Sequence, residues 1–121
     1  MSLTNAIIKK LKEEGSIPTV ILFSDVDTWP EVPYVCVKPE AGSIPGTRQY
    51  RIIAHAAEKQ FSVLENYILV ELDRLLLGRM SDSEGNYYKL SANGYTDISQ
   101  EPGDITYFME QIYYTPMRKA Q

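Results

Sequence analysis

The chain has 121 residues, a length typical of one domain. Its net charge of −4 argues against a nucleic-acid-binding protein, because such proteins favour a basic face. No apolar run is long enough for a transmembrane helix, and no apolar stretch follows Lys9 and Lys10 as in a signal peptide, so we expect neither feature. The one cysteine, Cys36, rules out an internal disulfide and fits a reducing compartment.

Hydrophobic residues make up 44% of the chain, enough to fill a single core. We therefore expect one domain over residues 1–121, with a structured core over 3–116 and a C-terminal tail over 117–121. Nine tyrosines are unusual in so short a chain. Tyrosine suits half-buried surfaces, so they indicate either protein–protein contact or a tyrosine-rich sheet in a monomer.

The first third of the chain predicts a helix and two strands. Residues 3–14 have helical apolar spacing and are followed by stop signals. Residues 19–23, TVILF, are β-branched and apolar and predict a buried strand. A polar loop over 24–32 leads to a second strand over 33–38, which we expect to end at Pro39.

Residues 39–47, PEAGSIPGT, contain two prolines and two glycines and predict an irregular loop. Ile44 lies in its middle, among polar and small residues. Such a residue finds its partner either on another molecule or in a folded-back hairpin tip, and the sequence favours neither. The loop joins strands 33–38 and 48–56, which can pair antiparallel.

Residues 48–78 are the unit around which we expect the fold to be organised. Four residues would share one face of its strand: Tyr50, Ile52, Ala54 and Ala56. From Phe61 onward apolar residues recur every three or four positions, which predicts a helix over 62–77 that ends at Gly78. A start nearer Glu58 also fits. This is the only long, strongly amphipathic helix expected, so the sheet should pack on it.

The last part of the chain predicts three strands, over residues 87–90, 95–99 and 105–115. A polar loop over 79–86 precedes them. Asn93-Gly94 predicts a tight hairpin turn within 91–94, and residues 101–103 a further turn. The resulting prediction is an α+β fold. In it a small, mostly antiparallel or mixed β-sheet packs against a long central helix and a short N-terminal helix.

No residue set predicts catalysis. His55 is the only histidine, and the sequence places no nucleophile or orienting carboxylate beside it. Cys36 lies in an apolar strand, where cysteine behaves as a small hydrophobe. The GSIPG of residues 42–46 is no phosphate loop, because no lysine follows its second glycine and its proline lacks a backbone donor.

Two loops carry acids that superficially resemble cation sites. Asp25 and Asp27, with Glu31, lack the glycine and the further ligands of a calcium loop. In residues 82–86 the glycine, Gly85, falls at the wrong position for an EF-hand. We interpret both groups as solvated loop acids, and we expect no catalytic residue, metal or cofactor.

Three stretches resemble the tail terminator (tail-to-head joining) proteins of long-tailed bacteriophages. They are YRIIAHAAEKQFSVLENYILVELDRLLLG, SDSEGNYYKL and DITYFMEQIYYT. The resemblance covers roughly residues 3–116 and rests on patterns rather than catalytic signatures. Small phage neck and minor tail proteins have a similar size, charge and strand-helix order, so they are the nearest alternatives.

The resemblance implies a structural role without covalent chemistry or a cofactor. Such proteins have a small α+β fold and form a hexameric ring on the last ring of the tail tube, which stops tube polymerisation and fixes tail length. The implied partners are further copies of the chain, the tail tube protein and the head connector or neck protein, with no membrane. Genomic DNA passes through the lumen without specific binding. The implied location is the tail or neck of the virion, after assembly in the host cytoplasm.

A ring requires a heterologous interface, in which two different patches of each subunit meet. We expect the 39–47 loop to supply one patch, and the tyrosines of 87–95 with the end strand to supply the other. The candidate interface residues are Gly42, Ser43, Ile44, Pro45, Gly46, Arg48, Tyr87, Tyr88 and Tyr95. A net negative chain also suits a lumen in which DNA must slide, since basic residues would hold phosphates.

Two further hypotheses belong to other classes. A small metal-dependent hydrolase would use Asp25, Asp27 and His55, which must then converge in space. A general α+β interaction module of a cellular complex would lack phage head and tail genes as genomic neighbours.

Overall fold

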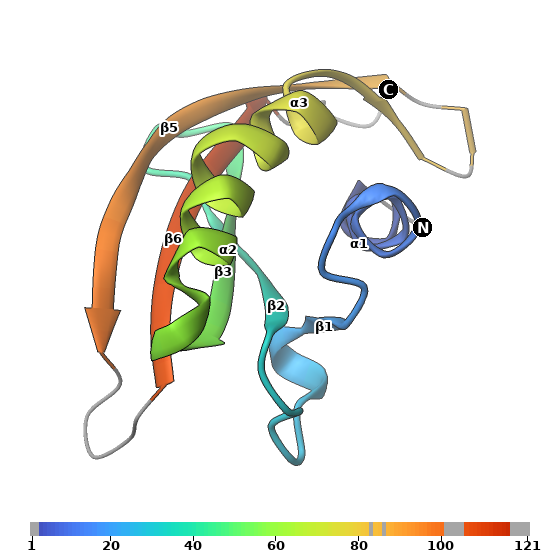
Figure 1. Ribbon diagram of the computed structural model, residues 1–121. Coiled ribbons are helices and arrows are strands. Elements are labelled where there is room, and N and C mark those ends of the chain that lie inside the picture. Colours follow the sequence, from blue (N-terminus) through green and yellow to red (C-terminus); the bar gives the residue numbers. More distant parts are fainter. Residues whose placement is uncertain (1–2, 83, 86, 101–105, 117–121) are drawn as a thin grey trace.

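The computed structural model describes residues 3–82, 84–85, 87–100 and 106–116. The turn predicted at 101–103 and the tail predicted at 117–121 lie outside these residues. Within them, six strands form one sheet in the order β1-β2-β3-β6-β5-β4 (Figure 1). The strands are β1 (Val20–Leu22), β2 (Tyr34–Ala41), β3 (Thr47–Ala57), β4 (Gly78–Ser81), β5 (Tyr87–Gln100) and β6 (Thr106–Pro116). Only β1 and β2 pair in parallel; the other neighbours in this sheet are antiparallel.

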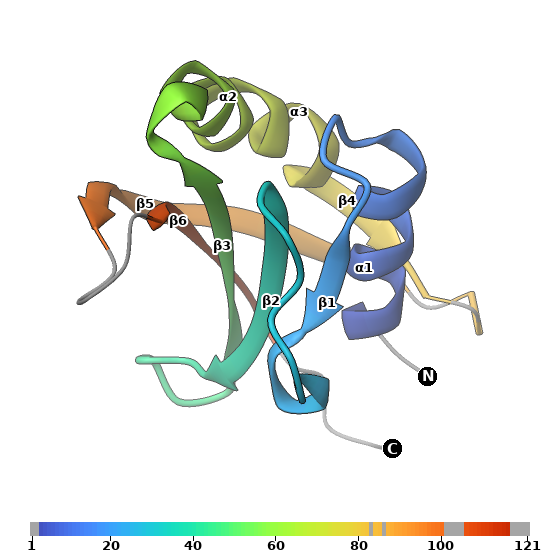
Figure 2. The ribbon, with the colours of Figure 1, turned by 60° about the horizontal axis from the view of Figure 1, so that its bottom comes forward.

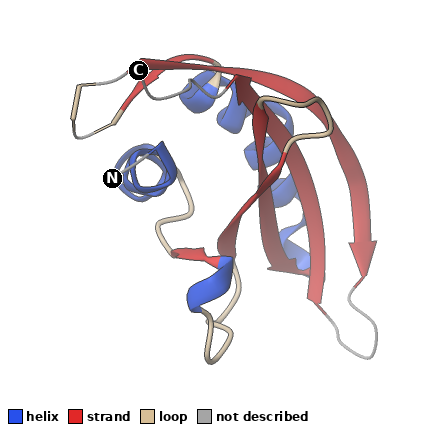
Figure 3. Cartoon of the chain, turned by 180° about the vertical axis from the view of Figure 1, so that it is seen from behind, coloured by secondary structure: helices blue, strands red, loops and turns tan. Residues whose placement is uncertain are grey.

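The predicted fold class was wrong, because the sheet rather than a central helix dominates the architecture. Strands hold 47% of the described residues and helices 32%, so the fold is mostly β. The sheet curls into a half-barrel, and the helices lie on its inner side (Figures 1 and 3). The strands are longer than the local pattern suggested, because pairing between distant segments extends them through residues that favour turns.

Strand β5 shows this most clearly. It runs for 14 residues through Asn93 and Gly94, where a hairpin turn was predicted. Its pairing with β6 shifts register between Ala92 and Tyr95 and again between Thr96 and Ser99. Gly94 adopts a φ of +98°, which only glycine adopts readily. The Asn-Gly pair therefore serves as an irregularity inside a long strand rather than as a hairpin turn.

Strand β2 also extends past its predicted end at Pro39, and continues to Ala41. Strand β1 pairs with β2 only as far as Val37, so Pro39 lies where β2 is an edge strand. Proline is tolerated there, because no strand of the described residues pairs with β2 on its other side at this point and no hydrogen bond on that side needs the amide hydrogen that proline lacks. A four-residue strand, β4, replaces part of the loop predicted at 79–86.

A 3₁₀ turn over Phe23–Asp25 follows β1. Besides it, the described chain has two helical stretches, one of which spans about 19 residues, from Glu58 to Leu76. A 3₁₀ turn (Glu58–Gln60) precedes α2 (Phe61–Asn66), a π-helical turn (Tyr67–Glu71) and α3 (Leu72–Leu76). Glu71 in the π turn is buried beside Tyr67 and Ile68. The uniform α-helix predicted over 62–77 was wrong in this respect, because a π turn interrupts it.

Helix α1 (Leu3–Glu14) closes the open side of the half-barrel. It contacts the two edge strands, β1 and β4, and also α3 (Figure 2). Its buried face consists of Leu3, Thr4, Ile7 and Leu11. The core therefore lies between the inner face of the sheet and the two helical stretches.

Candidate functional site

The face of β2, β3 and β6 that points away from the helices carries the most distinctive side chains of this protein. We call it the outer face; Figure 3 shows the sheet from this side, with the 58–76 helical stretch behind it. Its residues lie in four rows across the three strands, set by the antiparallel register. The rows are Tyr34–His55–Phe108, Cys36–Ile53–Glu110, Lys38–Arg51–Ile112 and Glu40–Gln49–Tyr114.

One end of the outer face forms a concave site of about 380 Å³, which we call the aromatic pocket. The loop after β1 folds over the strand ends and supplies four of its ten lining residues. The lining residues are Phe23, Trp29, Pro30, Val32, Tyr34, Cys36, Ile53, His55, Thr106 and Phe108. A pocket of this size and composition suits an apolar group.

Ring contacts hold the walls of the aromatic pocket together. His55 stacks on Tyr34 with ring centroids 4.5 Å apart. Trp29 lies 5.9 Å from Tyr34 and 6.1 Å from His55, and Phe108 lies 5.9 Å from His55. Tyr34 and His55 are buried, whereas 51% of Trp29 is exposed, so Trp29 forms the solvent side of the site.

Neither His55 nor Cys36 in the aromatic pocket is suited to covalent chemistry. Burial lowers the pKa of His55 to about 4, although the charge of Glu110 opposes the shift, so the imidazole is neutral at pH 7. Burial raises the pKa of Cys36 to about 11, against the attraction of Lys38. The thiol therefore stays protonated at neutral pH, and a protonated thiol is a poor nucleophile.

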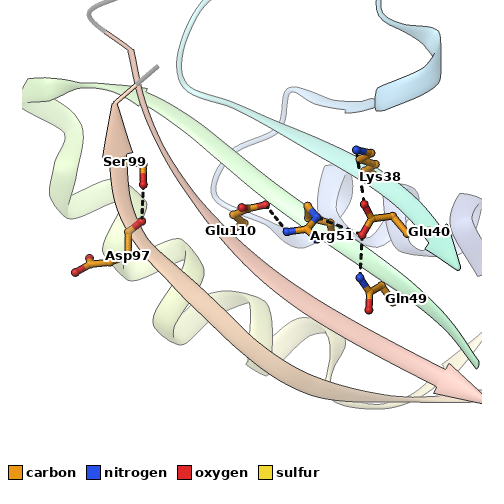
Figure 4. A network of polar contacts seen from close by, with 7 residues as sticks. All are labelled: Lys38, Glu40, Gln49, Arg51, Asp97, Ser99 and Glu110. Carbon is orange, nitrogen blue, oxygen red and sulfur yellow. Dashed lines mark hydrogen bonds and ion pairs between the residues drawn. The ribbon is translucent and has the colours of Figure 1, made fainter. Parts of the chain in front are cut away.

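The middle of the outer face carries an ion network formed by Lys38, Glu40, Gln49, Arg51 and Glu110 (Figure 4). Arg51 bridges two carboxylates, with Nε 3.2 Å from Oε1 of Glu40 and one terminal nitrogen 3.0 Å from Oε2 of Glu110. Gln49 donates a hydrogen bond of 2.9 Å to Glu40, and Nζ of Lys38 lies 3.6 Å from the same carboxylate. Burial alone would raise the pKa of Glu40, but Gln49, Arg51 and Lys38 together lower it. Two cations balance two anions, so the network presents no net charge.

The opposite end of the outer face is the hairpin turn between β2 and β3, residues 42–46, which we call the Ile44 turn. The amide of Gly42 donates to the carbonyl of Thr47 at 3.0 Å. The amide and hydroxyl of Thr47 both donate to the carbonyl of Ile44, at 3.1 and 2.6 Å. A Cβ on Gly42 would lie 1.9 Å from Oγ1 of Thr47, so this closed turn requires glycine. Although the turn folds back on itself, 61% of Ile44 remains exposed.

The predicted interface residues lie in different surroundings in the structure. Ser43 and Ile44 line a small cleft of about 90 Å³ with Asn93 of β5, so the turn lies near the middle of that strand. Tyr87 and Tyr95 are more than half exposed. Tyr88 packs against the core and donates a long hydrogen bond of 3.4 Å to Asp82.

Arg48, the remaining predicted interface residue, is half-buried on β3. It forms no ion pair within the described part of the chain. It lies two residues after the Ile44 turn, so the charged residue nearest to that turn along β3 is a cation.

The loop acids do not assemble into a site with His55. Among the residues that the structure describes, no three His, Cys, Asp or Glu side chains are grouped so that they could hold a metal ion. Asp25, Asp27 and Glu31 are exposed on the loop that walls the aromatic pocket. Asp82 accepts a hydrogen bond of 2.9 Å from the amide of Glu84, which makes it a turn-forming residue.

No model of a known protein family matches this chain, and no curated protein shows significant sequence similarity to it. None of the helices in the described ranges has the length and apolar character needed to cross a bilayer.

The aromatic pocket is the feature that the sequence analysis missed. Its signal was the single tryptophan, Trp29, placed next to Pro30 in an otherwise polar loop. A large apolar side chain in such a loop needs a surface to pack on. That surface is supplied by Tyr34, His55 and Phe108, which come together only through strand pairing.

Proposed function

We propose that this chain is a structural tail terminator of a long-tailed bacteriophage. In this proposal it forms a homo-oligomeric ring, a hexamer, that caps the tail tube, fixes tail length and joins the tail to the head connector. The phage context comes from the resemblance of the sequence to that family. The observation that carries the proposal is the presence of two different apolar features, the aromatic pocket and the Ile44 turn, at opposite ends of one sheet face.

A closed ring needs two different patches on each subunit, held at a fixed separation. Strands β2 and β3 connect the aromatic pocket to the Ile44 turn. β2 alone has eight residues, which span about 26 Å at 3.3 Å per residue. The ion network joins β2, β3 and β6 between the two ends, so the spacing is held by paired backbone and by side-chain contacts.

The role of a tail terminator also implies partners other than further copies of the chain. The tube protein and the head connector would bind the two sides of the ring, and genomic DNA would pass through its centre. The net charge of −4 supports a lumen that does not retain DNA. No cofactor and no enzymatic step belong to this proposal, and the virion tail or neck would be its location.

The test is the assembly state of the purified chain, alone and mixed with tail tubes. Native mass spectrometry should find a ring, with or without the tube, and electron microscopy should place it at the tube end. Deleting the gene from the phage should yield tails of abnormal length. A chain that stays monomeric, binds no tube end and leaves tail length unchanged when deleted would refute the proposal.

The same electron microscopy images distinguish a tail terminator from the second candidate, which is another small neck or minor tail protein. Such a protein would lie elsewhere in the particle or bind without ending tube growth. A hydrolase that uses Asp25, Asp27 and His55 is not favoured, because the described residues do not group these side chains into a metal site.

A further inference from the structure

The aromatic pocket leaves apolar surface exposed that an apolar group would cover. Phe23 is 42% exposed and Trp29 51% exposed at its mouth. Lys38 lies over the ring of Phe23, with Nζ 4.8 Å from the centroid, so one side of the mouth is already screened. An occupant gains most by covering Trp29, and it must be narrow enough to enter a site of about 380 Å³.

Ile44 has the chemistry and the presentation of such an occupant. It has the highest exposed fraction, 61%, among the large apolar side chains of the described residues. The hydrogen bonds between Thr47 and the Ile44 carbonyl hold the turn in one conformation. Little conformational entropy would therefore be lost on binding.

The charges around the two features are complementary. Asp25, Asp27 and Glu31 are exposed on the loop that walls the aromatic pocket. Arg48 flanks the Ile44 turn and forms no ion pair within the described residues. Docking of the turn into the pocket would bring this cation toward the acidic loop, and complementary charges favour one orientation over others.

The two features cannot meet within one molecule. They lie at opposite ends of β2 and β3, about 26 Å apart along the paired strands. An Ile44 turn that occupies the pocket must then come from a second copy, and each copy offers one pocket and one turn. Contact of this kind is head-to-tail, which is the heterologous geometry that generates rings.

We propose that the Ile44 turn of one subunit inserts into the aromatic pocket of the next subunit, and that Arg48 then faces the acidic 25–31 loop. This inference deepens the ring proposal and rests on it. It assigns the subunit contact to one pocket and one turn, and it leaves Tyr87 and Tyr95 outside that contact.

Trp29 is the only tryptophan of the chain and lies at the pocket mouth, so its fluorescence reports occupancy directly. Assembly of the wild-type chain should shift its emission to shorter wavelength as the side chain leaves water. Ile44→Asp should weaken association by about tenfold or more, as expected for an apolar anchor. Val70→Asp is the matched control, because Val70 is 59% exposed on the helical stretch and lies outside both features. It should assemble like the wild type.

A charge exchange tests the orientation. Arg48→Glu and Glu31→Arg should each weaken association, and the chain that carries both changes should recover it. Chains with Ile44→Cys and Pro30→Cys should form a disulfide with one another when mixed under oxidising conditions. Circular dichroism and the unfolding midpoint of each variant show whether its subunit is still folded.

The results of these experiments distinguish a failure of the Ile44 contact from a failure of the ring proposal. A ring that assembles without a Trp29 shift, or that forms equally well with Ile44→Asp, overturns this inference and leaves the ring proposal standing. A wild-type chain that remains monomeric with and without tail tubes overturns both. Unfolding of the isolated subunit by Ile44→Asp would also overturn the inference, because Ile44 would then be part of the core.

Discussion

The imidazole of His55 on β3 stacks on the ring of Tyr34 on β2, with centroids 4.5 Å apart and an angle of 11° between the planes. The two residues are directly opposite in the antiparallel register, and both are buried. Trp29 and Phe108 contact the same imidazole from the loop and from β6. His55 thus joins three parts of the chain at the base of the aromatic pocket.

This environment predicts acid sensitivity of the fold. The pKa of His55 is 6.5 in an unfolded chain and about 4 in the folded protein, because burial disfavours the imidazolium. Between these values the unfolded state binds more protons, so the free energy of unfolding decreases as the pH falls from 6.5 toward 4. We expect His55 to account for about 2 kcal/mol of loss at pH 4.5 relative to pH 7.5.

The measurement is urea unfolding at both pH values, for the wild type and for His55→Phe. Phenylalanine keeps an aromatic ring on Tyr34 but does not titrate. The variant should lose less stability than the wild type by about 2 kcal/mol over this pH range, since only the shared carboxylates still titrate. Equal losses in the two proteins would contradict the prediction.

Two buried tyrosines are expected to respond in opposite ways to removal of their hydroxyl groups. Tyr113 donates a hydrogen bond of 2.7 Å to Asp73, whereas the Tyr67 hydroxyl has no hydrogen-bond partner among the described residues. Tyr113→Phe should destabilise the fold by about 1.5–3 kcal/mol, because it removes a hydrogen bond to a charged group. Tyr67→Phe should leave stability unchanged or raise it by about 1 kcal/mol, because it removes an unsatisfied buried group. Thermal or denaturant unfolding of the two variants tests this order, and a larger loss in Tyr67→Phe would reverse it.

Glu71 connects the π turn to the segment that follows α1. Its carboxylate accepts hydrogen bonds from the amide and the hydroxyl of Ser16, at 2.6 and 2.5 Å. Glu71→Ala should cost about 3 kcal/mol, because it leaves the Ser16 donors without this acceptor and opens a gap beside α1. Arg74→Ala is the control: its guanidinium lies 4.0 Å from the same carboxylate and is largely exposed, so its loss should cost less than about 1 kcal/mol. Similar losses in the two variants would mean that the Ser16 contact contributes little.

Cys36 should resist thiol reagents while the protein is folded. Only 1% of it is exposed, and burial raises its pKa to about 11, so little thiolate forms at pH 8. We expect iodoacetamide to label it at least about a hundredfold more slowly than in urea-unfolded protein, because thiolate is the reactive form. Labelling followed by mass spectrometry measures both rates. Rapid labelling of the folded chain would show that the aromatic pocket opens as far as Cys36.

Part of the fold could be predicted from local pattern alone. The antiparallel pairing expected between 33–38 and 48–56 is confirmed by the register of β2 with β3. These strands are neighbours in sequence and are joined by a short turn. The apolar face expected for 48–56 is the face that packs in the core, so no distant contact was needed to specify it.

The predictions of secondary structure failed where pairing between distant segments outweighed the local preference of the residues for a turn. Asn93 and Gly94 favour a hairpin turn, but β6 pairs with β5 on both sides of them, from Ser91 to Gln100, and keeps the chain extended. The hydrogen-bond partner of Glu71 could not be predicted for a similar reason. It is Ser16, which lies 55 residues away in sequence.

By itself the sequence determined the antiparallel pairing of 33–38 with 48–56 and the place of Ile44 in the turn between them, but not whether Ile44 is exposed. Only the tertiary structure decided that the fold is a curled, mostly β half-barrel, and that Trp29, Tyr34, His55 and Phe108 form one pocket. The physical reason is the range of the interactions. A turn is specified by a few adjacent residues, whereas a pocket across β2, β3 and β6 exists only after strand pairing has aligned residues from distant parts of the chain.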